Sequence, residues 1–338
     1  MELRNAIARA FFCAVALFTA MPAPAQSFRA YLSSTGNDAN PCSLQQPCRL
    51  LPAALAAVAD GGEIWMLDSA NYNTATVSVT KSVTILAIPG VNGSVLATGG
   101  GNAIDINTAG VKVTLRNLVI GHLTSSNRGV SFTQGAQLGI SGCEISGIQG
   151  AAVYASASGG KVSVRNSVLR GSGGTSVGVR TLGDVNATLD GVQVKGFLQG
   201  IYADAGGRVT VSDSVLAGNT TGAIVISSGG ADTRFVIAHS AVSGNAEGLR
   251  GQTTTMLDSV SLTARNNSIS HNTTAGIRLS HAASSSLVVA LDANTIAENN
   301  VGIEVIGGTP SLRTRENNAM KFNTPDVSGG ALTPLAPQ

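Results

Sequence analysis

Residues 200–222 read GIYADAGGRVTVSDSVLAGNTTG, and the same pattern restarts every 22 to 28 residues through most of the chain. Each restart is a small residue followed by a short strand of alternating apolar and polar residues, here Gly200-Ile-Tyr-Ala. A second such strand, here Val209-Thr-Val-Ser, ends at a turn residue, Asp213. A fixed period of this length predicts a solenoid. The alternation with a period of two indicates that the solenoid is built from strands.

Stacked repeats would place equivalent residues of successive coils in columns, because parallel strands pair in register at about 4.8 Å. We expect the residue after the small one to point inward: Ile104, Val130, Ala152, Val179, Ile201, Ala223, Leu249, Ile277 and Ile303. We expect a second inward column two positions later: Ile106, Phe132, Tyr154, Thr181, Ala203, Val225, Gly251, Leu279 and Val305. The residues between them would point outward: Asp105, Ser131, Val153, Arg180, Tyr202, Ile224, Arg250, Arg278 and Glu304.

Two kinds of turn separate the strands. The first is expected at Asn117, Gly142, Asn166, Gly191, Asp213, His239, Asn266 and Ala293. Most of these are residue types that adopt a positive φ at least cost, as a sharp bend requires. The second is marked in the C-terminal half by Gly218-Asn219, Gly244-Asn245, His271-Asn272 and Asn299-Asn300. Stacked Asn amides in such a column can hydrogen-bond to one another.

The first 25 residues have the pattern of an export signal. Arg4 and Arg9 flank the start of an apolar run over residues 10–20, and the run is followed by the tripeptide APA at residues 23–25. The run is too short to span a bilayer, and the small residues after it are typical of a cleavage site. We therefore predict a signal peptide over residues 1–25 and a secreted or periplasmic protein.

Residues 26–62 are predicted to contain a strand, a disulfide loop and a capping helix. Cys42 and Cys48 enclose a short loop, and in an exported chain such a pair is expected to form a disulfide. Cys143 lies near a repeat turn, where we expect a buried free thiol.

The helix is expected over residues 52–59, which begin with proline and continue with strong helix formers. A short apolar helix at this point would cover the open end of the solenoid core. The β-helix itself is expected over residues 63–323, followed by a tail over residues 324–338.

The arrangement resembles the right-handed parallel β-helix proteins of the pectin lyase-like superfamily, and the N-terminal stretch resembles secreted bacterial β-helix repeat proteins. The second resemblance is carried by Tyr31-Leu-Ser-Ser, Thr35-Gly-Asn-Asp-Ala-Asn-Pro, the helix over residues 53–59 and Gly61-Gly-Glu. The resemblance implies an all-β fold, a single right-handed parallel β-helix of roughly ten coils with a short N-terminal capping helix. It does not imply one activity, because the superfamily contains lyases, hydrolases, epimerases and proteins of no known activity.

Composition argues against several kinds of partner. Only 12% of the residues are charged and the formal net charge is +2, which is too balanced to attract nucleic acid. No apolar stretch after residue 25 reaches membrane-spanning length, so we do not expect membrane insertion. The histidines lack the spacing of metal ligands, and no phosphate-binding or dinucleotide fingerprint occurs. We therefore predict neither a metal site nor a cofactor.

The catalytic motifs that the resemblance would imply are also missing. The sequence has no adjacent acidic pair as in polygalacturonase-like hydrolases, no clustered carboxylates as in calcium-dependent pectate lyases, and no Asp-Pro-His-Asp segment as in mannuronan epimerases. We therefore favour an exported binding or structural protein, with a polysaccharide or cell-surface glycan as candidate partner, over an enzyme. The alternatives are a polysaccharide lyase or glycoside hydrolase acting on acidic polysaccharide, and a surface- or ice-binding solenoid.

The candidate ligand site lies on an outer face, where a solenoid presents side chains to solvent. Guanidinium groups suit carboxylates through paired hydrogen bonds, and a tyrosine ring offers an apolar face to a sugar. We expect six residues of this face to contact a ligand: Arg180, Tyr202, Asp204, Arg250, Arg278 and Glu304. The alternative for these residues is a solvated charge ladder without a ligand.

Overall fold

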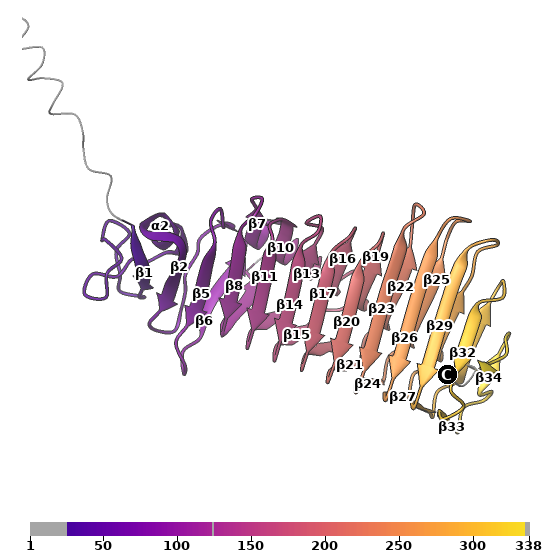
Figure 1. Cartoon of the computed structure of the whole chain (residues 1–338). Coiled ribbons are helices and arrows are strands. Elements are labelled where there is room, and N and C mark those ends of the chain that lie inside the picture. The colour runs from indigo at the N-terminus through magenta and orange to yellow at the C-terminus, as the bar shows by residue number, and fades with distance from the viewer. Residues whose placement is uncertain (1–25, 124, 335–338) are drawn as a thin grey trace, which may run out of the picture.

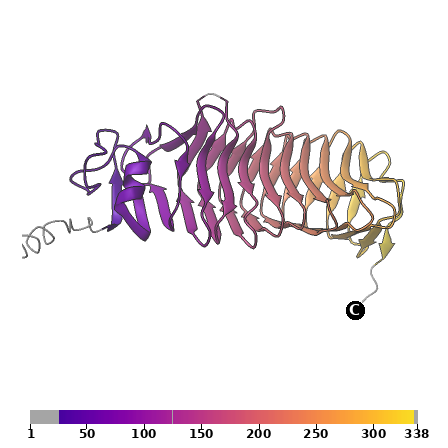
Figure 2. The same ribbon diagram turned by 90° about the horizontal axis from the view of Figure 1, so that it is seen from above.

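The chain forms an elongated parallel β-helix in a computed structural model, which describes residues 26–123 and 125–334 (Figures 1 and 2). The predicted signal peptide, residues 1–25, lies outside the described residues, as do the last four residues of the predicted tail. A typical coil contributes one strand to each of three sheets. Two sheets contain 11 strands and the third contains 13, so the prediction of a strand solenoid of roughly ten coils is confirmed.

The strands of each sheet follow one another in chain order, and every pairing is parallel. Sheet A contains β1 (Ser27–Leu32), β2 (Val58–Met66), β5 (Val83–Ala87), β8 (Lys112–Arg116), β11 (Gln137–Ser141), β14 (Lys161–Arg165), β17 (Asn186–Asp190), β20 (Arg208–Ser212), β23 (Asp232–Ala238), β26 (Ser259–Arg265), β29 (Ser286–Asp292), β32 (Ser311–Thr314) and β35 (Thr333–Pro334). Sheet B contains β3 (Ala70–Asn71), β6 (Gly93–Ala97), β9 (Leu118–His122), β12 (Glu144–Ser146), β15 (Val168–Arg170), β18 (Gln193–Lys195), β21 (Val215–Ala217), β24 (Ala241–Ser243), β27 (Ser268–Ser270), β30 (Thr295–Ala297) and β33 (Ala319–Lys321). Sheet C contains β4 (Val77–Ser78), β7 (Asn102–Asn107), β10 (Arg128–Gln134), β13 (Ala151–Ala155), β16 (Val177–Leu182), β19 (Gln199–Asp204), β22 (Thr221–Ser227), β25 (Glu247–Thr253), β28 (Ala275–Ser280), β31 (Val301–Ile306) and β34 (Val327–Ser328).

The N-terminal end carries the one helix of the described chain, α2 (Leu51–Ala57). It starts one residue before the predicted range and ends two residues earlier, because Val58 is already extended and begins β2. Leu51, Ala54 and Leu55 of the helix are buried in the core cluster. The helix therefore covers the end of the core, as the sequence predicted.

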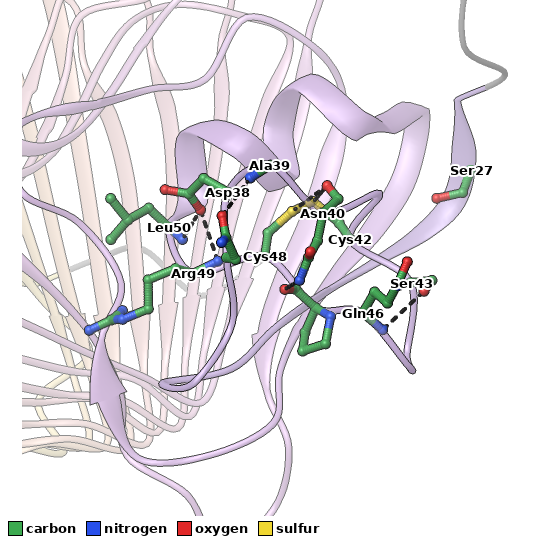
Figure 3. The surroundings of a disulfide bond; sticks show 12 residues. Ser27, Asp38, Ala39, Asn40, Cys42, Ser43, Gln46, Cys48, Arg49 and Leu50 are labelled. Atoms are coloured by element: carbon green, nitrogen blue, oxygen red, sulfur yellow. Dashed lines mark hydrogen bonds between the residues drawn. A yellow bond between two sulfur atoms is a disulfide. The ribbon is translucent and has the colours of Figure 1, made fainter.

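The predicted disulfide between Cys42 and Cys48 is present, and Figure 3 shows its surroundings. The loop that it closes lies along β1: the backbone N–H of Cys48 donates to the carbonyl of Tyr31 (3.0 Å), and the N–H of Tyr31 donates to the carbonyl of Cys42 (2.8 Å). Asp38 then accepts hydrogen bonds from the N–H groups of the two residues after Cys48, both at 2.8 Å. The loop thus covers the outer edge of the first strand of sheet A, an edge that would otherwise expose unpaired backbone groups.

The predicted columns are correct except in one coil, where they are wrong by one residue. Val130 pairs with Val153 and Ser131 pairs with Tyr154. Val153 is therefore inward and fully buried, and Tyr154 is outward and partly exposed. Two alanines, Ala151 and Ala152, stand at the start of this strand. The sequence pattern placed Ala151 at the small-residue position, but Ala152 occupies it. Because side chains alternate along a strand, a slip of one residue exchanges the inward and outward sets.

The predicted bends are confirmed. The backbone φ lies between 47° and 62° at Asn117, Gly142, Asn166, Gly191, Asp213, His239, Asn266 and Ala293. The Asn stack is also present, with amide-to-amide hydrogen bonds of 2.8 to 3.1 Å through Asn219, Asn245, Asn272, Asn299 and Asn323. Asn299, and not Asn300, occupies the column in its coil.

A second buried column, which we did not predict, follows the bend residue of each coil. Most of its members are polar, so we call it the inner polar column: Cys143, Ser167, Val192, Ser214, Ser240, Asn267, Asn294 and Asn318, of which Val192 is apolar and Asn318 is only partly buried. Its asparagines form a ladder, with Asn267 to Asn294 and Asn294 to Asn318 both at 2.9 Å. Its N-terminal members are smaller. Cys143 is a buried free thiol, as predicted, and its sulfur accepts a hydrogen bond from the N–H of Leu118 at 3.4 Å.

The segment predicted as a tail adds strands to the solenoid. Val327–Ser328 pairs with β31 and Thr333–Pro334 pairs with β32. These short strands form a partial coil at the C-terminal end (Figure 1).

Candidate functional site

The outward side chains at the centre of sheet C form a continuous row, which we call the outer column. The pairing register gives its order along the solenoid as Asp105, Ser131, Tyr154, Arg180, Tyr202, Ile224, Arg250, Arg278 and Glu304. Successive members are about 4.8 Å apart, because each belongs to the next coil. All six predicted ligand residues lie in this row or beside it.

The first half of the row contains Tyr154 and Tyr202 with Arg180 between them, and Arg128 lies beside the row at the start of β10. Arg128 extends from β10 over the ring of Tyr154, with its Cζ 3.5 Å from the ring centroid. Arg180 lies over Tyr202 in the same way, at 5.1 Å. A cation–π contact of this kind contributes about 0.5–1 kcal/mol at an exposed site. We call Arg128, Tyr154, Arg180 and Tyr202 the Arg/Tyr segment.

In the part of the chain that the structure describes, the two guanidinium groups of the Arg/Tyr segment lack acidic partners. Among the described residues, neither Arg128 nor Arg180 forms a salt bridge within 4.0 Å. Arg128 donates one hydrogen bond, from Nη1 to the hydroxyl of Ser131 at 3.0 Å. The Nε of Arg180 is buried and has no hydrogen-bond partner within the described chain. The segment therefore presents uncompensated positive charge beside two aromatic rings.

Asp204 ends the strand that carries Tyr202 and is held by its neighbours. Its carboxylate accepts hydrogen bonds from the N–H of Ala205 (2.6 Å), the hydroxyl of Ser228 (2.9 Å) and the hydroxyl of Tyr202 (3.4 Å). Burial, followed by the charge of Asp204, raises the pKa of Tyr202. Tyr202 is thus a neutral donor at physiological pH, and Asp204 fixes where its hydroxyl points.

The second half of the row is an ion-paired segment formed by Glu247, Arg250, Arg278 and Glu304. The Nε of Arg278 lies 3.0 Å from Glu304, and the Nη1 of Arg250 lies 3.6 Å from Glu247. Arg278 also contacts Glu247 directly. Two carboxylates neutralise two guanidinium groups, so this half has no net charge. Ile224, which is 6% exposed, lies between the two halves.

Residues 177–330 match the family model of the right handed beta helix region. The chain is a right-handed β-helix protein with the pectin lyase-like fold. No curated protein matches its sequence significantly.

Solved structures agree with this assignment. The β-helix is similar to pectate lyase Pel9A, with a TM-score of 0.55 and 14% identity over 90% of this chain and 78% of that one. It is also similar to the enzymatically active domain of tailspike protein 2 of bacteriophage CBA120, with a TM-score of 0.53 and 12% identity. That match covers 79% of this chain but 48% of the tailspike chain, so this protein spans about half of its length. At such identities the likeness shows the fold alone.

Three residues of this β-helix face were missed by the sequence analysis. Tyr154 was placed inward by the one-residue slip. Arg128 and Glu247 lie at the first paired position of their strands, outside the column that we considered. The signal for Glu247 was an acidic residue three positions before Arg250 in the same strand, β25.

Two further features of this β-helix bear on its chemistry. No group of three or more His, Cys, Asp or Glu side chains in residues 26–123 and 125–334 is arranged to hold a metal ion. Within the same residues, no helix is long and apolar enough to cross a membrane.

Proposed function

We propose that this β-helix protein binds an acidic polysaccharide along the outer column of sheet C, and that the Arg/Tyr segment makes the main contacts. The observation that supports the proposal is the alternation of Arg128, Tyr154, Arg180 and Tyr202 in successive coils, with no acidic partner for either guanidinium group among the residues that the structure describes. A linear polymer and a solenoid face are both repetitive in one direction, so several contacts can form at once.

Each component of the segment has a specific role in this proposal. A guanidinium donates two parallel hydrogen bonds to a carboxylate, which fixes orientation as well as charge. The tyrosine rings offer rigid apolar faces with a polar end, and they lose little conformational entropy on binding. The stacking of Arg180 on Tyr202 holds both groups in place before the ligand arrives. The ion-paired segment, with Arg250, Arg278 and Glu304, forms the flank of the same face and contributes less.

Binding without cleavage fits the carboxylates of this face. Hydrolysis of a glycosidic bond needs two carboxyl groups, one of them free to give or take a proton. Glu247 and Glu304 are paired with arginines, and the oxygens of Asp204 accept hydrogen bonds from three neighbours. The proteins of similar fold described above include one named as a pectate lyase, which supports a carbohydrate ligand and leaves the lyase activity as the competing hypothesis.

The test is affinity electrophoresis in gels that contain polygalacturonate. We expect wild-type protein to be retarded, and the Arg128→Gln/Arg180→Gln double variant to lose most of the retardation, with an apparent Kd at least about tenfold weaker, equivalent to about 1.4 kcal/mol. The matched control is Arg165→Gln/Arg208→Gln on sheet A, which removes the same charge from two exposed positions.

The control keeps the effect of net charge separate from the effect of the site. Equal loss in both double variants, or no retardation of the wild type, would contradict the proposal. An incubation of wild-type protein with polygalacturonate is then assayed for unsaturated products and new reducing ends. Their appearance would favour the lyase or hydrolase hypothesis over binding alone.

A further inference from the structure

A hollow of about 470 Å³ lies on the outer side of sheet A, near the N-terminal end of the solenoid. Its lining consists of Trp65, Leu86, Ala87, Pro89, Gly90, Arg116 and Asn117. These residues come from β2, β5 and β8 and the turns that follow β5 and β8, and the strands lie side by side in Figure 1. Small-molecule sites commonly occupy about 300–1,000 Å³ and combine an apolar lining with a few polar groups. The hollow has that size and that composition.

Trp65, the single tryptophan of the chain, is fixed in orientation. Its indole N–H donates to Oε2 of Glu63 at 3.0 Å, and the Cζ of Arg29 lies 4.1 Å from its ring centroid. Arg29 in turn donates two hydrogen bonds to Glu63, at 2.7 and 2.9 Å, and lowers the pKa of that carboxyl group. The ring of Tyr31 meets Trp65 edge-on, with centroids 6.4 Å apart. A large partly exposed ring held by three contacts is pre-organised to receive a flat apolar surface.

Arg116 supplies the one cationic group of the hollow. Trp65 pairs with Leu86, and Leu86 pairs with Arg116, so the three residues form one row across the neighbouring strands β2, β5 and β8. Arg116 is exposed, and no acidic group of the described chain lies within 4.0 Å of its guanidinium. Glu63 is bonded to Arg29 and feels Arg116 only through its charge, so the N–H donors of Arg116 are left for a ligand.

Asn117 keeps the wall of the hollow in position. Its side-chain amide donates to the carbonyl of Ala87 at 3.1 Å and to the carbonyl of the next residue at 3.3 Å. These bonds tie the turn that contains Pro89 and Gly90 to the end of β8. The hollow is therefore built from residues that are held independently of any ligand.

We propose that this hollow is a second binding site, which takes one acidic sugar unit: the apolar face of the pyranose ring stacks on Trp65 and the carboxylate binds Arg116. The site lies on a different sheet from the Arg/Tyr segment and shares no residue with it. It goes beyond the function proposed above and does not depend on it.

The single tryptophan makes the site directly measurable. Intrinsic fluorescence of the full protein, excited at the indole, is titrated with tetragalacturonate and separately with the neutral tetrasaccharide cellotetraose. We expect a saturable change of Trp65 emission with tetragalacturonate and a response to cellotetraose at least about fivefold weaker in apparent affinity, because only the acidic ligand pairs with Arg116. Arg116→Gln should weaken the tetragalacturonate response by a similar factor.

The matched control is Arg165→Gln, which removes an exposed arginine from the same outward column of sheet A two coils further on. It should titrate as the wild type does. Arg128→Gln/Arg180→Gln should also keep the full fluorescence response, even if binding at sheet C is lost, which separates the two sites. The proposal is overturned if Trp65 emission does not change, if Arg116→Gln titrates like wild type, or if the response disappears with Arg128 and Arg180.

Discussion

The N-terminal and C-terminal halves of this β-helix use the same positions in the coil but satisfy their polar groups differently. In the C-terminal half, two Asn ladders run through the buried columns, and Glu247, Arg250, Arg278 and Glu304 neutralise one another on the surface. In the N-terminal half, the inner polar column begins with Cys143 and Ser167, and within the described chain the arginines of the Arg/Tyr segment form no salt bridge.

The difference teaches that one repeat position can serve either stability or recognition. A ladder of asparagines satisfies backbone groups of adjacent coils and bonds to itself, so each member has little capacity left for a ligand. An arginine stacked on a tyrosine is positioned equally well, but its donors remain available. We therefore expect mutations in the C-terminal half to change stability, and mutations in the N-terminal half to change binding.

The largest expected effect is in the inner polar column. Asn267→Ala would remove the acceptor for the N–H of Ser240 (3.0 Å) and the donor to the carbonyl of Ile237 (3.0 Å), and would leave Asn294 without one partner. Buried polar groups left unpaired cost about 1–3 kcal/mol each, so we expect the free energy of unfolding to fall by about 3 kcal/mol. Urea denaturation measures the change.

The serine members of the same column offer the comparison. Ser214 accepts one hydrogen bond, from the N–H of Val192 at 3.1 Å, and donates one, to the carbonyl of Ser212 at 2.7 Å. Ser214→Ala should therefore cost about 1–2 kcal/mol, less than Asn267→Ala. Asn300→Ala, at an exposed position beside the first ladder, should be nearly neutral. Equal losses at Asn267 and Ser214 would show that the ladder adds no stability beyond single hydrogen bonds.

A smaller effect is expected when the neutral half of the outer column is made cationic. Glu247 is 7% exposed and contacts both Arg250 and Arg278. Glu247→Gln should lower the free energy of unfolding by about 1–2 kcal/mol, below the cost of a fully buried pair because both arginines are partly exposed. It should also strengthen the retardation in polygalacturonate gels by a few-fold, with a steeper dependence on salt.

Glu144→Gln is the matched control for this change. It removes the same charge from an exposed pair with Arg170 on sheet B, where the ion pair is worth about 0–1 kcal/mol. If Glu247→Gln and Glu144→Gln alter the retardation equally, the ion-paired segment is not part of the ligand face, and the contrast between the two halves holds for stability alone.

The sequence predicted the coil repeat, the bends and the disulfide because each depends on local residue types. A bend column of Asn, Gly and Asp needs only the φ preferences of those residues, and even His239 and Ala293 adopt the expected bend at φ 50° and 52°. The slip at Tyr154 arose because two alanines were equally good candidates for the small-residue position. Which of them lies in the column is decided by packing against the neighbouring coils, and no local pattern contains that information.

The candidate sites were less predictable for a similar reason. The position of Glu247 beside two arginines follows from pairing between coils, and it changes the interpretation of Arg250 and Arg278 from free cations to neutralised ones. The hollow beside Trp65 depends on three strands and two turns that are separated in the sequence. Residue type alone therefore indicated where charge occurs along the chain, but not whether that charge is available.

A pH-dependent effect is expected at the first member of the inner polar column. Burial raises the pKa of the Cys143 thiol to about 11. In the unfolded chain the thiol ionises near pH 8.5–9, so with rising pH the unfolded state loses its proton first. The stability that comes from the neutral buried thiol is complete below about pH 8.5. Between about pH 9 and 11 the free energy of unfolding should fall, by at most about 1.4 kcal/mol per pH unit.

Cys143→Ser is the suitable reference for that measurement, because serine does not titrate in this range and already occupies the same column at Ser167 and Ser214. The difference in unfolding free energy between wild type and Cys143→Ser, measured by urea denaturation from pH 7 to pH 10.5, isolates the thiol from the tyrosines, which titrate in both proteins. Thiol labelling of protein without residues 1–25, which contain Cys13, provides a second measurement: native protein should not react, and unfolding without reductant should expose one reactive thiol, since Cys42 and Cys48 are bonded to each other. Two results would contradict this prediction: a difference in unfolding free energy that does not change with pH, or labelling of Cys143 in the native protein. Either result would show that water reaches the N-terminal end of the inner polar column, which would then be less tightly packed than the Asn ladder that follows it.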